Sequence, residues 1–297
     1  MSDYLVKSLA CDGHLRAYAI DATETIREAQ KRQDTWSAAS AALGRSMIGT
    51  LLLATSSLKG DEKMTVKING NGPVGGIVID GNSKGTVKGY VQNPHVHLPL
   101  NDKGKIDVKG AVGTEGFLAV TKDYGLKEPF TGQVPLVSGE IAEDITQYFV
   151  QSEQIPTACA LGVLIDTDQS VRAAGGYLIQ LLPGAGEDVI TKVEGGIYAA
   201  PSVTNILKEN PDPAAMLKTV LSDFDMEILS VDPIEYRCYC SRERTERALL
   251  SLGSKDLEQI VEEQGGAELS CQFCDKVQTF TADELRAMIA DLKARGK

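Results

Sequence analysis

Four cysteines near the C-terminal end of this 297-residue chain constrain its fold more than any other feature. They form a C-x-C pair, Cys238 and Cys240, and a C-x-x-C pair, Cys271 and Cys274, with thirty residues between the pairs. Two such pairs, brought together by a loop, supply the four thiolates that a tetrahedral zinc ion accepts. Each pair is also close enough in sequence to close on itself as a disulfide. The same sulfurs can therefore hold a metal when reduced and release it when oxidised.

The segment that carries these cysteines, residues 233–297, is about 65 residues long. A unit of that size rarely gains enough stability from core burial alone, and it often needs a metal ion or a disulfide. Its patterns predict two helices at 241–250 and 256–263, a hairpin at 267–279 and a closing helix at 282–293. We therefore expect a small C-terminal zinc-binding unit of ααββα type, with the second cysteine pair in the hairpin.

Charge around the first cysteine pair also suits a thiolate site. Four thiolates around Zn²⁺ leave a net negative charge, and nearby cations offset such charge and favour thiolates. The arginines near the first pair outnumber the neighbouring glutamates; the six residues are Arg237, Arg242, Arg244, Arg247, Glu243 and Glu246. An iron–sulfur cluster is the minor metal alternative, since C-x-C is not a usual ferredoxin spacing. Closed four-cysteine sites are usually structural, so spacing alone leaves a structural zinc knuckle beside a redox switch.

Composition limits the classes of partner and compartment. The formal net charge is −11 and the sequence pI is about 4.9, without a long basic run, which disfavours nucleic acid and anionic membranes. Six cysteines are too few and too unevenly placed for a secreted disulfide scaffold. The N-terminal residues show no basic region followed by an apolar run, so we expect no signal peptide and a reducing cytoplasm. We interpret Cys11 and Cys159 as buried small apolar residues.

One apolar stretch, residues 35–58, is a candidate membrane span. Arg45 interrupts it and leaves an uncharged run of 13 residues, which is too short to cross about 30 Å of hydrocarbon. Its many small residues instead predict a core helix against which neighbouring elements pack closely.

The rest of the chain predicts an α+β fold, with an N-terminal mixed α/β core domain at residues 1–182. Apolar residues at 141, 145, 148 and 149 predict a helix that ends before Pro156. Strands are predicted at 65–69, 76–80, 86–92, 105–112 and 116–122, followed by a buried hairpin at 161–166 and 172–182.

Residues 183–232 are predicted to form a metastable helical linker. Glycine and proline punctuate the segment 187–210 and weaken its helical pattern. Asp212 and Pro213 then supply a cap and a first-turn proline for a short helix at 214–222.

Two further motifs predict no site. The run from Gly70 to Gly75 fits G-x-G-x-x-G, but a strand rather than a helix follows it, so we interpret it as a hairpin turn. His95 and His97 lie on one face of an extended segment, and the chain has only one other histidine, His14. A pair of imidazoles without further ligands rarely makes a metal site.

The cysteine pattern at the end of a chain of this length closely resembles the redox-regulated 33 kDa chaperonin family (heat-shock protein 33). The resemblance extends over essentially the whole chain. Residues 39–53 look like the family's long N-terminal helix, and the glycine-rich run 69–91 resembles its sheet. Residues 143–163 resemble the central helix and the strand that follows it.

The resemblance implies an ATP-independent holdase, not an enzyme, of the bacterial cytoplasm, which is dimeric when active and binds unfolding client proteins under oxidative and heat stress. It implies one Zn²⁺ per chain in the reduced state, held by the four cysteines, and disulfides Cys238–Cys240 and Cys271–Cys274 in the oxidised state. Residues 1–182 would then bind clients and dimerise, 183–232 would be the linker, and 233–297 the redox switch.

Two alternatives to the holdase remain. The first is a zinc module with a constitutive interaction role; the acidic charge speaks against nucleic acid as its partner. The second is a thiol–disulfide oxidoreductase that uses Cys271 and Cys274, although the usual βαβ context around C-x-x-C is missing.

Overall fold

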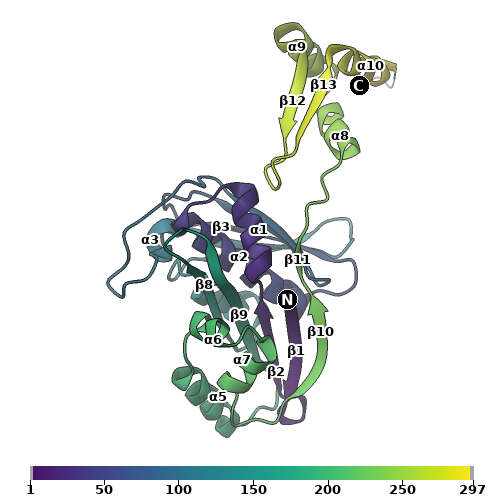
Figure 1. The fold of residues 1–297 in the computed structure, drawn as a ribbon. Coiled ribbons are helices and arrows are strands. Elements are labelled where there is room, and N and C mark those ends of the chain that lie inside the picture. Colours follow the sequence, from purple (N-terminus) through teal and green to yellow (C-terminus); the bar gives the residue numbers. More distant parts are fainter. Residues whose placement is uncertain (1–2, 295–297) are drawn as a thin grey trace. The chain divides into compact units, whose positions relative to one another are not determined.

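The structure is a computed structural model, and it describes residues 3–294. Contacts divide the chain into two compact units, Met1–Arg237 and Cys238–Lys297 (Figure 1). Helices and antiparallel sheets are mixed in both units, so the predicted α+β class is confirmed.

The first unit contains a five-stranded sheet in which every neighbouring pair of strands is antiparallel. One edge strand comes from residues 157–165 and the other from residues 227–233, because the chain leaves the sheet after residue 181 and returns to it at residue 227. The strand order is β10 (Glu227–Pro233), β1 (Tyr4–Ala10), β2 (Leu15–Asp21), β9 (Val171–Leu181) and β8 (Thr157–Ile165).

A six-stranded sheet forms the other layer of the first unit, and only its two-residue edge strand β11 pairs in parallel. The strand order is β11 (Glu235–Tyr236), β5 (Thr86–Val91), β4 (Ile77–Asn82), β3 (Lys63–Asn69), β6 (Phe117–Asp123) and β7 (Phe130–Pro135). The turn at Gly70–Gly75 joins β3 to β4, as predicted.

One predicted strand is wrong. Residues 105–112 were expected to continue the meander, but they contain the short helix α3 (Val108–Val112). The Asp107 carboxylate accepts a hydrogen bond from the Gly110 backbone N–H at 2.8 Å. This cap satisfies a free N–H of the first turn and so favours helix over strand.

Helix α2 (Ser37–Ser57) forms the centre of the first unit (Figure 1). Small residues let its neighbours approach: a side-chain carbon added at Gly49 would lie 2.2 Å from Cδ1 of Ile145. The helix is long and apolar enough to cross a membrane, but 89% of its most apolar stretch is buried inside the fold. The prediction of a core helix is therefore confirmed.

Two helices flank this core, and of these only the one that ends before Pro156 was predicted from the sequence. Helix α1 (Thr23–Gln33) precedes α2, and α4 (Ala142–Tyr148) continues into a π-helical turn at Phe149–Glu153. The Asp144 carboxylate accepts backbone N–H groups at the start of α4, including that of Ile141 at 3.0 Å. The helix ends before Pro156, as predicted.

The opposite face of the five-stranded sheet is covered by α5 (Glu187–Ala199), α6 (Val203–Glu209) and α7 (Pro213–Val220). Their buried side chains pack against apolar side chains of β1, β2 and β9. Asp212 caps α7 by accepting the Ala214 N–H at 2.8 Å, which confirms the predicted start of that helix. The division into residues 1–182, 183–232 and 233–297 stays a prediction, because it concerns how these parts behave on activation.

The second unit has the predicted order of two helices, a hairpin and a closing helix. These elements are α8 (Arg242–Leu252), α9 (Ser254–Gln264), β12 (Gly266–Ser270), β13 (Val277–Thr281) and α10 (Ala282–Ala294). Its core is small and consists of Leu249, Leu257, Phe280, Leu285, Ile289 and Leu292.

Candidate metal centre

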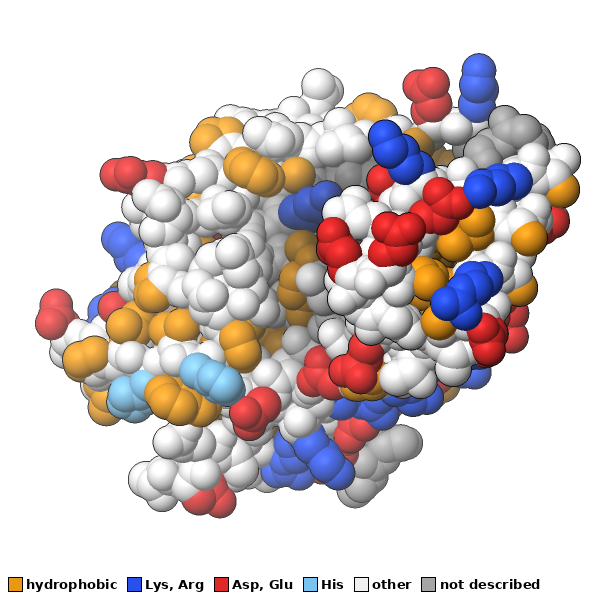
Figure 2. Space-filling model, turned by 90° about the horizontal axis from the view of Figure 1, so that it is seen from above, with side chains coloured by type: hydrophobic (Ala, Val, Ile, Leu, Met, Phe, Trp, Pro, Cys, Tyr) orange, Lys and Arg blue, Asp and Glu red, His pale blue; other side chains and the backbone are white. Residues whose placement is uncertain are grey.

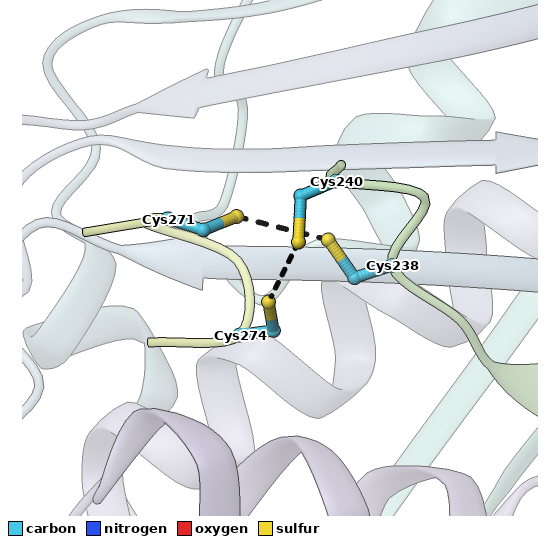
Figure 3. Close-up of side chains that lie close together, drawn as sticks. All are labelled: Cys238, Cys240, Cys271 and Cys274. Carbon is cyan, nitrogen blue, oxygen red and sulfur yellow. Dashed lines mark hydrogen bonds between the residues drawn. The ribbon is translucent and has the colours of Figure 1, made fainter. Parts of the chain in front are cut away.

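The four C-terminal cysteines come from two segments of the second unit. Cys238 and Cys240 lie in the irregular stretch before α8, whereas Cys271 and Cys274 lie in the turn that joins β12 to β13. In that turn the Cys274 N–H donates to the Cys271 carbonyl at 3.2 Å. This tight turn holds the second pair on one side of the hairpin, and the sulfurs of both pairs converge there (Figure 3).

The spacing of the sulfurs fits a metal ion. All four Sγ atoms lie within 4.8 Å of one another. The Cys238 and Cys271 sulfurs are 3.7 Å apart, and those of Cys240 and Cys274 are 3.3 Å apart. A tetrahedral site with zinc–sulfur bonds of about 2.3 Å places its sulfurs about 3.8 Å apart. The four cysteines can therefore hold a metal ion, and an all-thiol donor set of this kind is consistent with zinc.

Protons compete with such an ion, because a cysteine binds a metal as the thiolate. Burial, together with hydrogen bonds to Cys274 and Cys238, raises the pKa of Cys240 to about 12. Burial also acts to raise the pKa of Cys274, but hydrogen bonds from the Lys276 backbone and from neighbouring thiols lower it overall. Without a cation the cluster thus stabilises negative charge on Cys274, whereas a bound cation favours thiolates at all four positions.

Arg242, the arginine nearest in sequence to Cys240, is paired with carboxylates and so is not free to neutralise the sulfurs. The Arg242 guanidinium pairs with Glu284 at 2.6 Å and with Glu246 at 3.6 Å, and it donates to the Thr279 carbonyl at 3.0 Å. Its positive charge is thus shared with two carboxylates, which weakens the expectation that it offsets the cage. Instead Arg242 joins the start of α8 to β13 and α10.

The other two cysteines, Cys11 and Cys159, lie in the first unit, whereas the four-cysteine cluster lies in the second. Cys159 is on β8, packs against the core around α2, and burial raises the pKa of its thiol. Cys11 packs against the core beneath α5. Both pack against an apolar core, as predicted, but their side chains are half-buried rather than fully buried.

The histidines do not converge. Nε2 of His95 lies 2.9 Å from Asp34 Oδ2, and Nδ1 of His97 lies 2.8 Å from the Ser37 hydroxyl. Nδ1 of His14 lies 2.9 Å from the Pro183 carbonyl. Within residues 3–294, the four cysteines are the group of three or more histidine, cysteine or carboxylate ligands that comes close enough to share one metal ion.

A family model described as Hsp33 protein matches residues 3–281 of the chain. The chain belongs to the Hsp33 family. Among its relatives, the 33 kDa chaperonin of Lactiplantibacillus plantarum is 54% identical over 293 residues, which cover 99% of each chain. The 33 kDa chaperonin of Latilactobacillus sakei is 51% identical, over 98% of this chain and 100% of the relative.

The solved structures agree with this membership. The crystal structure of the 33 kDa chaperonin (heat shock protein 33 homolog) from Thermotoga maritima superimposes with a TM-score of 0.90. It is 38% identical and the match covers 99% of this chain and 100% of that one. The Hsp33 fold therefore extends over nearly all of the described chain, and membership of a family of chaperonins supports a chaperone function.

Proposed function

We propose that this Hsp33-family chain is a redox-regulated, ATP-independent holdase of the bacterial cytoplasm. In the reduced state Cys238, Cys240, Cys271 and Cys274 would hold one Zn²⁺ per chain. In the oxidised, metal-free state the protein would bind unfolding clients as a homodimer. The observation that carries the proposal is the convergence of two local cysteine pairs on one potential metal site, within 4.8 Å.

A metal at this site would act as the main staple of the second unit. The core of that unit contains only six buried apolar side chains among its described residues. Metal binding contributes about 10–16 kcal/mol to small zinc-dependent folds. The four ligands would tie the stretch before α8 to the β12–β13 hairpin, across the thirty residues that separate the pairs.

Oxidation of the local pairs would remove that staple. Cys238 and Cys240 would form one disulfide and Cys271 and Cys274 the other, each pair of metal-bound thiolates losing two electrons while the metal ion leaves. One hydrogen peroxide per pair accepts the two electrons, takes up two protons from the solvent and is reduced to two waters. Each ring closed in this way is so short that its entropic stabilisation is at most about 2 kcal/mol. Neither disulfide would join the two segments, so the unit would loosen.

The pairing of the oxidised cysteines is decisive for this mechanism. In the reduced geometry close sulfur contacts run across the pairs, Cys238 to Cys271 and Cys240 to Cys274. Disulfides formed across the pairs would keep the stretch before α8 joined to the β12–β13 hairpin, so the unit would stay folded after the metal leaves. The holdase mechanism therefore requires the local pairing.

The surface for clients would be the sheet face that α5–α7 cover. Apolar side chains of β1, β2 and β9, among them Val6, Ala17 and Ile179, are buried beneath these helices. Release of the helices would expose this face together with their own apolar sides, and a large exposed apolar patch is a binding surface for unfolded chains.

Charge supports protein clients over nucleic acid. On the face drawn in Figure 2, basic side chains are interspersed with acidic ones rather than gathered in a continuous basic surface. The formal net charge is −11, which repels a polyanion.

Light scattering of a heat-unfolding enzyme tests the proposal, with reduced and oxidised protein at equal concentration and without ATP. We expect the oxidised form to suppress aggregation and the reduced, metal-loaded form to do little. Equal protection by both forms would indicate a constitutive binding module, and protection by neither would indicate a structural metal protein. Catalysed reduction of insulin by Cys271 and Cys274 would favour the oxidoreductase alternative.

A further inference from the structure

Tyr4 touches two elements that are distant in sequence. It is the first residue of β1, where its backbone lies opposite Pro233 of β10. Its phenol O–H donates a hydrogen bond to Asp212 Oδ1 at 3.1 Å. The same carboxylate caps α7 by accepting the Ala214 N–H. One side chain thus contacts the N-terminal cap of α7 from a strand that is paired with β10.

The Tyr4–Asp212 bond is a polar contact in an interface dominated by apolar side chains. Helices α5–α7 dock on the sheet through residues such as Leu207, Met216 and Leu217, which are at most 3% exposed. Apolar packing gives area but little directional preference, whereas a hydrogen bond to a carboxylate has a defined geometry. This bond therefore adds a directional contact between α7 and β1 to the apolar packing.

Strand β10 is the covalent route from the cysteine cage to α7, and it is a weakly covered edge. It pairs with β1 on one side only, and its register shifts opposite Lys7 and Ser8. Its apolar side chains Ile228, Leu229 and Val231 are 39%, 52% and 58% exposed. An edge strand with an irregular ladder and exposed side chains separates from its sheet more easily than a central one.

We infer that Tyr4 and Asp212 form a latch through which strand β10 controls the docking of helices α5–α7. While β10 stays paired with β1, the backbone of Tyr4 is held where its hydroxyl reaches Asp212. When β10 separates, the first residue of β1 loses one of its two neighbours, and the bond to α7 weakens with it. This inference rests on the proposed function, because it names the residues that pass the state of the second unit to the linker helices. Tyr4 and Asp212 act as positioning residues.

The chemistry of the pair suits a latch. Burial, and then the hydrogen bond to Asp212, raise the pKa of Tyr4 to about 12, so the phenol remains a donor at neutral pH. A hydrogen bond to a charged acceptor stabilises a folded state enough to change an open population by on the order of tenfold.

The test uses the full chain in its reduced, metal-loaded state. Tyr4→Phe keeps the ring and removes the donor, and amide hydrogen exchange reports on residues 214–220 of α7. We expect about tenfold faster exchange in α7, with metal content and exchange of the second unit unchanged. Tyr198→Phe is the matched control, because this tyrosine on α5 is 94% exposed and removal of its hydroxyl should change nothing.

A double-mutant cycle separates a latch from a general loss of packing. Asp212→Ser keeps a side chain that caps helices well but is too short to hold the bond to Tyr4. We expect Asp212→Ser to accelerate α7 exchange by itself, and Tyr4→Phe added to it to change the rate by less than about twofold. Additive effects of the two substitutions, or an α7 exchange rate in Tyr4→Phe within twofold of the wild type, would overturn the latch.

Failure of the latch is distinguishable from failure of the proposed function. Exchange is measured on reduced protein without a client or an oxidant. Tenfold faster α7 exchange in a protein that never suppresses aggregation would support the latch and overturn the holdase. Unchanged exchange in a protein that does respond to oxidation would overturn the latch alone.

Discussion

The guanidinium of Arg242 lies over the ring of Phe280, with its Cζ atom 4.2 Å from the ring centroid. Phe280 is 2% exposed and belongs to the small core of the second unit, while Arg242 follows Cys240 by two positions. The cage and the core are thus joined by a contact that uses no sulfur. Part of the packing between α8 and the hairpin can therefore outlast the metal.

Arg242→Ala is expected to weaken this connection. Loss of the ring contact and of the charged hydrogen bonds to Glu284 and Thr279 should cost about 1–2 kcal/mol, because the side chain is partly solvent-exposed. Thermal unfolding of the metal-loaded second unit and competition with a chelator measure the effect. Arg286→Ala is the control, since its pair with Asp283 lies within α10 and is exposed. Equal effects of the two substitutions would contradict a special role for Arg242.

Cys271→Ser should remove one of four metal ligands. We expect metal content well below one equivalent per chain, and a second unit that loosens without oxidant. Cys11→Ser and Cys159→Ser should keep full metal content and the response to oxidant, because both lie in the first unit. Metal analysis and thiol titration of the three variants check this, and loss of the response in either control would mean that the wrong cysteines were identified.

Oxidation with peroxide and mild heat should form the local disulfides and release the metal. Peptide mapping is expected to find Cys238–Cys240 and Cys271–Cys274, and hydrogen exchange to find the helices of the second unit unprotected. The competing result is crosslinking of Cys238 to Cys271 or of Cys240 to Cys274, whose sulfurs are in contact in the reduced protein. That result, with protection retained, would contradict the release mechanism.

Local patterns predict the second unit well because its elements are sequential neighbours. Helices α8–α10 and the β12–β13 hairpin each carry their own periodicity and turn signals, and Gly253 and Gly265 separate them at positive φ. The cysteine spacing likewise predicts that the four sulfurs meet. The cross-pair sulfur contacts and the reach of Arg242 to Phe280 depend on the path of the chain in space, which spacing does not encode.

Long-range pairing explains what the sequence does not predict. Strand β10 joins β1 across more than two hundred residues, and Asp232 with Pro233 looks locally like the start of a new unit. In the structure Pro233 still pairs with Tyr4, and Ile234 is buried in the core of the first unit. At residues 105–112 two local signals compete, a strand-like pattern of side chains and a helix cap at Asp107. The cap prevails, and residues 108–112 form a helix.

Alkaline pH should weaken the Tyr4–Asp212 latch. The pKa of Tyr4 is raised to about 12 by burial and by the bond to Asp212, above the ordinary value of about 10 for a free tyrosine. A raised pKa in the folded state means that this stabilisation is complete below about pH 10 and is lost as the pH rises through about 12. The difference in free energy of unfolding between wild type and Tyr4→Phe should therefore narrow across this window. A difference that stays constant from pH 9 to 12 would show that the phenol does not titrate as the structure implies.

Two adjacent glycines of α5 offer a matched pair of substitutions that act on the linker helices in opposite directions. A side-chain carbon added at Gly196 would lie 2.2 Å from the Val220 carbonyl oxygen of α7, whereas one added at Gly195 meets nothing within 4 Å. Gly196→Ala must push α7 away from α5, and we expect it to destabilise the linker helices by about 1–3 kcal/mol. Gly195→Ala should instead stabilise α5 by up to about 1 kcal/mol, because alanine favours a helix interior over glycine. In the aggregation assay, Gly196→Ala is expected to protect a client in part without oxidant, and Gly195→Ala to need more heat or oxidant than the wild type. If both variants behave like the wild type while their exchange rates in α5 and α7 differ as predicted, docking of these helices does not control activity.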